Sequence, residues 1–456
     1  MGFGMGRRQL LVLVSALAMV LFGAGIVGGL VAATQSDGGR EWIRAQASAL
    51  LNRGVRGRIT VGRLSGSFLT DLTIDTLELR DPDDSVYLAS GPLSLRYDPR
   101  DLADGRFVFR SLRARHPLMV VRRELDGAWN FRKIFPVEAD TRPMTPRSRG
   151  AFGALVLFHD IRIEGGEVRL TKPWNPDDSL SGPRRDSAIA VNLADTVNDI
   201  RRVTLRGRRG FQKTWRWADI SGEITRFRFR HPDSTGRQFD IATLDVNETV
   251  PPFAIRNLHG TALWRGDTVW FDTPRFALPG SAASAVGKVE WPTGDMFWDV
   301  RVRSDSVALE DIHWIYETLP RAGGGSMKLH VKSRPNPDII DYVITEMDVR
   351  SRGSRLRGDM TYGVGGPVLE VRDVKLSLEP ADFTLFETLN GRAFPYPWNG
   401  TVSGTVRASG GLVNRFRVEH VDLAFADRNV PGATARGTGH GELDILNPGL
   451  ARFHGF

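Results

Sequence analysis

Alternation of apolar and polar residues is the dominant pattern of this chain after residue 54. Leu93, Leu95 and Tyr97, for example, alternate with polar neighbours. A period of two is typical of a β-strand with one dry face and one solvated face. Turn sequences rich in Asp, Pro and Gly separate the stretches, at spacings that predict antiparallel meanders instead of βαβ units. The pattern therefore predicts a mainly β fold with few short helices.

A sequence unit occurs twice in the C-terminal half. Its first anchor is Gly287-Lys288-Val289-Glu290-Trp291, which matches Gly358-Asp359-Met360-Thr361-Tyr362 at an offset of 71 residues. Its second anchor is Ile315-Tyr316-Glu317-Thr318-Leu319, which matches Leu385-Phe386-Glu387-Thr388-Leu389 at an offset of 70 residues. A collinear period of this size is typical of supersecondary units that stack on one another.

Each copy of this unit is expected to hold a strand, a short helical turn and a further strand. The helical turns are expected at residues 312–319 and 383–389. A third copy opens at residues 432–443, so we expect the array to be incomplete at Phe456.

The N-terminal stretch of residues 9–36 contains no charged residue and is almost wholly apolar. A membrane-spanning helix needs about 20 apolar residues, whereas the core of a signal peptide has about 7 to 15. Length therefore favours a retained transmembrane anchor. Arg7 and Arg8 precede the stretch, which predicts a cytoplasmic N-terminus and export of the chain beyond residue 36. The alternative is a signal peptide cleaved after the small residues Ala32 and Ala33.

A short amphipathic helix is expected directly after this stretch, at residues 40–52. One side of it carries Trp42, Ile43, Gln46, Ala49 and Leu50. Two compatible interpretations stay open: the helix caps the first sheet, or it lies at the membrane interface and receives lipid.

Proline-rich segments without periodicity divide the exported part of the chain. We expect a cytoplasmic tip and anchor at residues 1–36, an N-terminal β-region with the amphipathic helix at 37–135, a linker at 136–150, a β-groove continuation at 151–271 with a loop at 172–187, and β-repeats of about 70 residues at 272–456.

The amino-acid composition limits the kinds of chemistry and of partner that the chain can have. The chain has no cysteine, which excludes disulfides, thiolate chemistry and cysteine-ligated zinc. Its net charge of +8 is compatible with nucleic acid, anionic lipid or an acidic surface as partner.

The densest basic patch is interleaved with the aromatic residues Phe211, Trp215 and Trp217. Its candidates for contact with an anionic headgroup are Arg206, Arg208, Arg209, Lys213 and Arg216. A solvated face, a lipid contact and a nucleic-acid contact all fit this patch. The predicted export argues against nucleic acid.

Motifs for catalysis are not found. The segment at residues 207–214 resembles a phosphate loop but has Gln212 where close approach of backbone to phosphate requires glycine. Residues 81–92 begin like a calcium loop but have Pro92 in place of the chelating glutamate, so we expect a turn. The nine histidines form no HExxH pair, and no GxSxG elbow occurs. We therefore predict no enzyme activity, no cofactor and no metal site.

Several segments resemble the N-terminal region of the AsmA-like / TamB family of bacterial envelope proteins. They are Gly62-Arg63-Leu64-Ser65-Gly66-Ser67, the strand at residues 72–80, Leu93-Ser94-Leu95-Arg96-Tyr97-Asp98-Pro99, Leu125-Asp126-Gly127-Ala128-Trp129-Asn130 and residues 159–170. The resemblance covers residues 7–170 in order. It implies a periplasmic protein of a two-membrane bacterium that is anchored in the inner membrane and contains an elongated, curled antiparallel β-sheet groove. It also implies phospholipid and an outer-membrane β-barrel protein as partners.

The alternating apolar residues are then expected to line the groove. The candidates are Leu93, Leu95, Tyr97, Phe107, Phe109, Ile161, Ile163, Val168, Leu170, Phe227, Phe229, Leu376 and Leu378. A closed sandwich would bury alternating faces equally well. The leading hypothesis is a bridge that conducts phospholipid between the two membranes. The alternatives are a factor that assembles outer-membrane β-barrel proteins by strand addition, and a scaffold with neither activity.

Overall fold

The computed structural model describes residues 37–454 apart from residues 53–54, 68–69, 99, 102–103, 105, 135–154, 177–179, 196–198, 206, 232–235, 251–253, 293–295, 314–317, 337–338, 366–367, 391–392, 394–398, 413–414 and 444–451. The expected membrane anchor and the expected linker therefore lie outside the described residues. Among the residues that are described, no helix is both long enough and apolar enough to cross a membrane.

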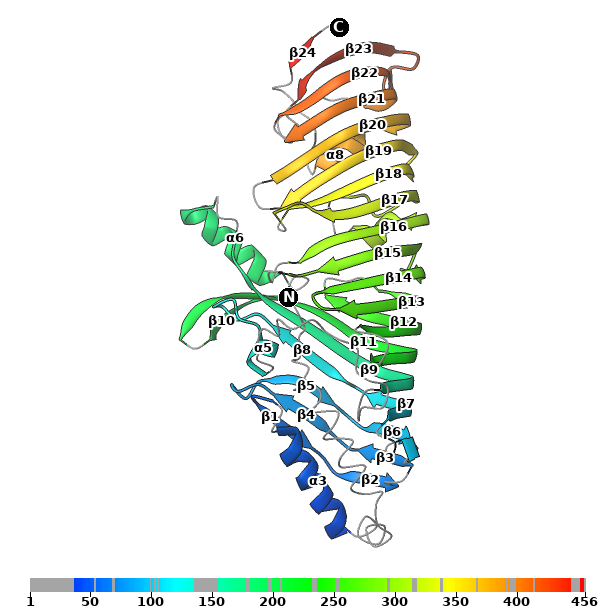
Figure 1. Ribbon diagram of the computed structural model, residues 1–456. Helices are drawn as coiled ribbons and strands as arrows, with labels where there is room; N and C mark the ends of the chain where they lie inside the picture. The colour runs from blue at the N-terminus through cyan, green and yellow to red at the C-terminus, as the bar shows by residue number, and fades with distance from the viewer. Residues whose placement is uncertain are drawn as a thin grey trace. The chain divides into compact units, whose positions relative to one another are not determined.

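The chain divides into an N-terminal unit that ends at Asp267 and a C-terminal unit that begins at Thr268. Both units consist mainly of β-strands, and the helices between the strands are few and short (Figure 1). The mainly β class predicted from the alternation of apolar and polar residues is therefore confirmed.

The N-terminal unit contains strands of 4 to 23 residues. Its strands are β1 (Arg58–Val61), β2 (Leu64–Ser67), β3 (Asp71–Ile74), β4 (Leu77–Arg80), β5 (Val86–Ser90), β6 (Leu93–Tyr97), β7 (Phe107–Arg115), β8 (Leu118–Arg122), β9 (Val156–Trp174), β10 (Ile200–Leu205), β11 (Arg208–Arg230), β12 (Arg237–Val250) and β13 (Arg256–Arg265). Its helices are α3 (Asp37–Asn52), α5 (Asn130–Ile134) and α6 (Gly182–Ala194).

The loop expected at residues 172–187 differs from the structure at both ends. Strand β9 continues to Trp174, because the alternation of Leu170, Lys172 and Trp174 extends into the proline-rich stretch. Helix α6 begins at Gly182, and a proline stands in its first turn. The backbone N–H groups of a first helical turn have no partner within the helix, so proline is tolerated there.

Strand β9 organises the N-terminal unit. One edge of β9 pairs antiparallel with β11, and its other edge pairs in parallel, first with β7 and then with β8. The change from one parallel partner to the other lies at Gly165 and Gly166, opposite His116 and Pro117. The antiparallel pairing that the sequence predicts is confirmed for most strands, and the pairings of β9 with β7 and β8 are the described ones that run parallel. The connection across residues 123–155 is long enough for the crossover that parallel strands require.

Two branches of strands leave β9 and share a packed core. One branch continues through β7, β6, β3 and β2, and the other through β8, β5, β4 and β1. Phe107, Phe109 and Leu72 of the first branch are each 1% exposed, and Ile59 of the second is 4% exposed. Helix α5 adds Ile134, which is 0% exposed. Each such side chain contributes about 1.5–3 kcal/mol to the stability of the unit.

Helix α3 caps the outer edge of β1. Asn52 donates from Nδ2 to the carbonyl of Ile59 at 2.9 Å and accepts the N–H of Ile59 at 2.7 Å. Arg44 donates to the carbonyl of Val61 at 3.0 Å. These bonds satisfy backbone groups that an unprotected edge strand would offer to another chain. The helix therefore caps the first sheet, and with Trp42 59% exposed, the interfacial role stays a prediction.

The C-terminal unit is an antiparallel meander. Its strands are β14 (Thr268–Ala277), β15 (Ala282–Glu290), β16 (Phe297–Ala308), β17 (Gly324–Ser333), β18 (Ile340–Ser351), β19 (Ser354–Gly365), β20 (Val368–Asp382), β21 (Gly400–Leu412), β22 (Phe416–Asp427), β23 (Thr434–Leu443) and β24 (Arg452–His454). Its helices are α7 (Leu309–Ile312) and α8 (Phe383–Asn390). Each strand pairs antiparallel with the next one along the chain.

The order of elements repeats in step with the sequence offset. The series β15–β16–α7–β17–β18 is followed by β19–β20–α8–β21–β22, and β23 occupies the place of β15 and β19. Helix α8 lies where a helical turn is expected at 383–389, whereas α7 begins before the turn expected at 312–319.

A buried serine recurs at the helical turn of each copy. The hydroxyl of Ser281 accepts the N–H of Ala308 at 2.8 Å, and the hydroxyl of Ser354 accepts the N–H of Asp382 at 2.8 Å. Ser281 is 8% exposed and Ser354 is 2% exposed. In both copies this bond fixes the end of the strand that leads into the helical turn.

Replacement of Asn52 by Ala is expected to lower the free energy of unfolding of the N-terminal unit by about 1–3 kcal/mol, because two backbone groups of Ile59 lose their partner. Urea unfolding measures the loss. Asn52→Asp keeps the acceptor for the N–H of Ile59 and should show a smaller loss. A stability of Asn52→Ala equal to that of the wild type would show that the cap is dispensable.

Replacement of Gly358 by Ala is expected to destabilise the C-terminal unit by at least about 1 kcal/mol. Gly358 has φ +133°, and a Cβ there would lie 1.8 Å from the carbonyl oxygen of Lys375. The matched control is Gly38→Ala, since an added Cβ at Gly38 meets nothing within 4 Å. Thermal unfolding of both variants makes the comparison, and equal melting temperatures would contradict the close backbone approach.

Candidate functional site: the apolar face of the sheets

The strand register of the C-terminal unit collects apolar side chains into rows on one face. One row crosses β16 to β19 through Val300, Val331, Tyr342 and Tyr362. The next row crosses the same strands through Val302, Leu329, Ile344 and Met360. All of these side chains are half-buried. A second layer of structure over them would leave them as inaccessible as Phe107, so the face is partly open to solvent.

Helix α8 closes one end of these rows. Phe383 and Phe386 of the helix pack against a cluster that contains Leu378, Ala381 and Val402. Leu378 is 5% exposed and Ala381 is 0% exposed. Away from the helical turn, Leu376 is half-buried and packs against a second buried cluster, which consists of Val374, Ala408, Phe416 and Val418.

The opposite face of the C-terminal unit carries networks of ion pairs across neighbouring strands. Arg334 donates to Asp341 at 2.8 Å and to Glu370 at 2.6 Å, and Arg372 donates to Asp341 at 2.8 Å. The hydrogen bond to Asp341 raises the pKa of Arg334 above its usual value. A Cβ on Gly363, which lies between these strands, would come within 2.6 Å of Arg334 Nη2.

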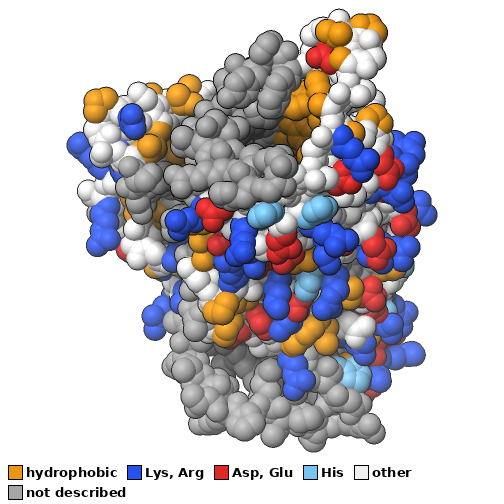
Figure 2. Space-filling model, turned by 90° about the horizontal axis from the view of Figure 1, so that it is seen from above, with side chains coloured by type: hydrophobic (Ala, Val, Ile, Leu, Met, Phe, Trp, Pro, Cys, Tyr) orange, Lys and Arg blue, Asp and Glu red, His pale blue; other side chains and the backbone are white. Residues whose placement is uncertain are grey.

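Charges of both signs are mixed over the surface, as Figure 2 shows. A single exposed ion pair contributes at most about 1 kcal/mol. The main effect of this face is therefore to keep one side of the sheet solvated while the other side stays apolar.

The N-terminal unit carries a ladder of phenylalanine rings that leads out of its closed core. The ring centroids of Phe109 and Phe158 are 4.7 Å apart, those of Phe158 and Phe227 are 5.8 Å apart, and those of Phe227 and Phe239 are 4.3 Å apart. Phe109 is 1% exposed, whereas the other three rings are half-buried. Aromatic stacking at these separations stabilises neighbouring strands. The ladder joins the packed core to the accessible apolar face across β7, β9, β11 and β12.

The structure divides the thirteen groove candidates into two groups. The buried ones, which belong to packed cores, are Leu95, Tyr97, Phe107, Phe109, Ile161 and Leu378. The half-buried ones, which remain accessible to a guest molecule, are Leu93, Ile163, Val168, Leu170, Phe227, Phe229 and Leu376. A lining role therefore fits the second group.

The basic candidates are also separated by the structure. Arg206 lies outside the described residues. Arg208 and Arg209 are exposed and line a cavity of about 400 Å³. Arg216 lies on the charged face, where it donates to Glu167 at 2.9 Å. Lys213 lies on the apolar face beside Trp215, with its Nζ 5.2 Å from the ring centroid.

The sequence did not indicate two cationic residues on the apolar face, Lys172 and Arg237. Lys172 pairs directly with Lys213, and Arg237 pairs with Trp264. The guanidinium carbon of Arg237 lies 4.6 Å from the centroid of the Trp264 ring. The signal in the sequence is weak: the alternation of Leu170, Lys172 and Trp174 puts Lys172 on the apolar side only if β9 is known to continue.

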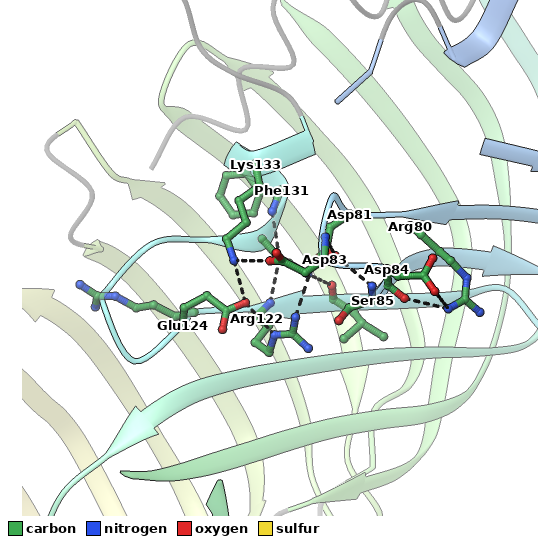
Figure 3. A network of polar contacts seen from close by, with 12 residues as sticks. Arg80, Asp81, Asp83, Asp84, Ser85, Arg122, Glu124, Phe131 and Lys133 are labelled. Atoms are coloured by element: carbon green, nitrogen blue, oxygen red, sulfur yellow. Dashed lines mark hydrogen bonds and ion pairs between the residues drawn. The ribbon is translucent and has the colours of Figure 1, made fainter. Parts of the chain in front are cut away.

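A group of three carboxylates, Asp81, Asp83 and Glu124, is the described cluster whose geometry could hold a metal ion (Figure 3). The residues around it already supply counter-charge. Lys133 donates to Asp83 at 2.9 Å and to Glu124 at 3.2 Å, and Arg122 donates to Glu124 at 3.1 Å. Asp81 accepts the backbone N–H of Asp83 at 2.9 Å, so it forms the turn that the sequence predicts at this position.

Comparison of the chain with known proteins gives no match to a family model, to a curated protein or to a solved structure.

Substitution of two phenylalanines of the ladder tests how accessible the apolar face is to solvent. Phe109→Ala removes a buried ring and is expected to destabilise the N-terminal unit by about 3–5 kcal/mol. Phe227→Ala removes a half-buried ring from the same ladder, so its loss should be clearly smaller. Urea unfolding of both variants gives the comparison. Equal losses would show that the face at Phe227 is sealed by packing.

Proposed function

We propose that the protein binds phospholipid on its apolar sheet face and conducts it between the inner and outer membranes of a two-membrane bacterium. The observation that carries the proposal is the half-buried apolar rows, exemplified by Leu329 and Ile344, on a sheet whose other face is charged. Apolar side chains that stay accessible over successive strands suit a guest with long hydrocarbon chains.

The energetics of lipid transfer explain the value of such a face. Exposure of about 30 methylenes at roughly 0.8 kcal/mol each costs on the order of 24 kcal/mol in water. A barrier of that height corresponds to a rate of roughly 10⁻⁵ per second. A continuous apolar face lowers this barrier because the acyl chains leave water while the headgroup stays solvated. The function then requires no catalytic residue.

The sequence supports the cellular setting of this proposal. The uncharged stretch at residues 9–36 serves as an inner-membrane anchor, with the β-units in the periplasm. The resemblance to the AsmA-like / TamB family over residues 7–170 supports the same setting. Phospholipid is the proposed cargo, the inner membrane its source or destination, and an outer-membrane β-barrel protein a further partner.

A pair of neighbouring residues on β18 tests the proposal. Ile344 lies on the apolar face and Thr345 on the charged face, opposite Lys328. Ile344→Asp places a charge where acyl chains would lie, which costs several kcal/mol, so lipid contact should fall at least about tenfold. Thr345→Asp, the matched control, should leave lipid contact unchanged.

The measurement uses the full chain with a photo-crosslinking amino acid at Met360, which pairs with Ile344. Phospholipid is identified by mass spectrometry after irradiation. Equal lipid capture by both variants would contradict a lipid path on this face. Capture of unfolded outer-membrane protein in place of lipid would favour the assembly factor.

A further inference from the structure

Helix α3 presents a stripe of exposed, uncharged residues. Trp42, Ala45 and Ala49 lie three or four residues apart, so they share one side of the helix. All three are exposed, Trp42 to 59%, and Gln46 beside them is exposed as well. Gly38 extends the stripe toward the start of the helix, and an added Cβ there would meet nothing within 4 Å. The stripe therefore consists of one large aromatic ring among smaller side chains.

Another side of α3 is fixed to the sheet. Arg44 donates to the carbonyl of Val61 at 3.0 Å, and Asn52, two turns further along the helix, bonds both backbone groups of Ile59. Rotation of the stripe toward the sheet would break these hydrogen bonds. The exposure of Trp42 is therefore a property of the folded N-terminal unit, and the stripe is available to a partner.

The position of α3 in the chain indicates which partner this is. The uncharged stretch of residues 9–36 ends directly before Asp37, the first residue of α3. Trp42 follows Asp37 at a distance of about 8 Å along the helix. The headgroup layer on each side of a bilayer is about 5–8 Å thick. Tryptophan is enriched in this layer because its ring is apolar and its N–H is polar. With residues 9–36 as the anchor, Trp42 therefore falls close to the lipid headgroups.

The acidic residues beside the stripe do not oppose contact with an anionic membrane. Glu41 accepts a hydrogen bond from Nε of Arg44 at 2.8 Å, so its charge is compensated. Asp37 lies in the first turn of α3, where the positive end of the helix dipole offsets a negative charge. The side chains of Ile43 and Leu50, which the sequence analysis expects near the stripe, lie outside the described ones.

We propose that α3 lies flat on the periplasmic surface of the inner membrane, with Trp42 inserted among the lipid headgroups and Ala45 and Ala49 against them. The inference rests on the proposed function, since it uses the same anchor, and it names the end of the protein that exchanges lipid with the bilayer. The small side chains beside Trp42 let the helix backbone approach the headgroups. Strands β1 and β2, which α3 contacts (Figure 1), are then the strands nearest to the membrane.

Fluorescent labels on single cysteines test this contact, because the chain has no cysteine of its own. The full-length protein is placed in vesicles of phosphatidylethanolamine and phosphatidylglycerol as Ala45→Cys, as Ala49→Cys or, for the control, as Thr261→Cys on the charged face of β13. Both α3 labels should show blue-shifted emission and quenching by lipids brominated near the headgroup. Iodide in the water should quench them at least about twofold less than the control label.

Three results would overturn the proposal. Full quenching of both α3 labels by iodide would put the helix in water. Protection of the label at Ala45 alone would show a helix that stands upright on the membrane. Protection from iodide without quenching by brominated lipid would show that protein, in place of membrane, covers the stripe.

Substitution of Trp42 tests its own part in the contact. Trp42→Ala should raise the iodide quenching of the label at Ala49, whereas Trp270→Ala, which removes another exposed tryptophan, should leave it unchanged. The melting temperature of Trp42→Ala should equal that of the wild type, because the ring is exposed, and no change in quenching would overturn the role of Trp42. Lipid capture at Met360 persists if only the helix contact is wrong. It fails, with the α3 labels still quenched by lipid, if the proposed function is wrong.

Discussion

The structure depends on one constraint: apolar and polar residues alternate along strands whose register is fixed. Because directly paired residues share a face, alternating strands gather apolar side chains on one side of the sheet and charges on the other. In the C-terminal unit Leu329 pairs with Ile344 on one face, while Lys328 pairs with Thr345 on the other. The described helices of this unit are the short α7 and α8, and the two rows that cross β16 to β19 stay half-buried. An accessible apolar face follows directly from that arrangement.

The N-terminal unit combines this open face with a closed core. Strand β9 pairs with β7 before Gly165 and with β8 after Gly166, and these two neighbours lead into separate branches whose large side chains are buried. The phenylalanine ladder then crosses from Phe109 in the core to Phe239 on the accessible side. The fully buried side chains of the two branches contribute most to the stability of this unit. The half-buried rows contribute less to stability and remain partly accessible to solvent.

The sequence predicts the strands and their apolar faces. It does not predict which rows of apolar side chains are fully buried and which stay half-buried. Phe109 and Phe227 have similar alternating neighbours, yet one is 1% exposed and the other is half-buried. Phe109 lies in the core that the two branches share, whereas Phe227 lies on β11 outside it, and no local pattern encodes that difference. Lys213 and Arg216 likewise belong to one basic patch in the sequence. The register with β9 puts Lys213 opposite Lys172 on the apolar face and Arg216 beside Glu167 on the charged face.

The buried serines of the repeat affect how the length of the sheet can change when copies are added or removed. Ser281 and Ser354 each fix the helical turn of their own copy, so a copy brings the hydrogen bonds that it needs. Duplication or deletion of one whole copy then keeps this bond in every copy that remains. Each copy supplies four strands, which at about 4.8 Å apiece add roughly 19 Å. A chain of this kind can therefore change its length in discrete increments of one copy.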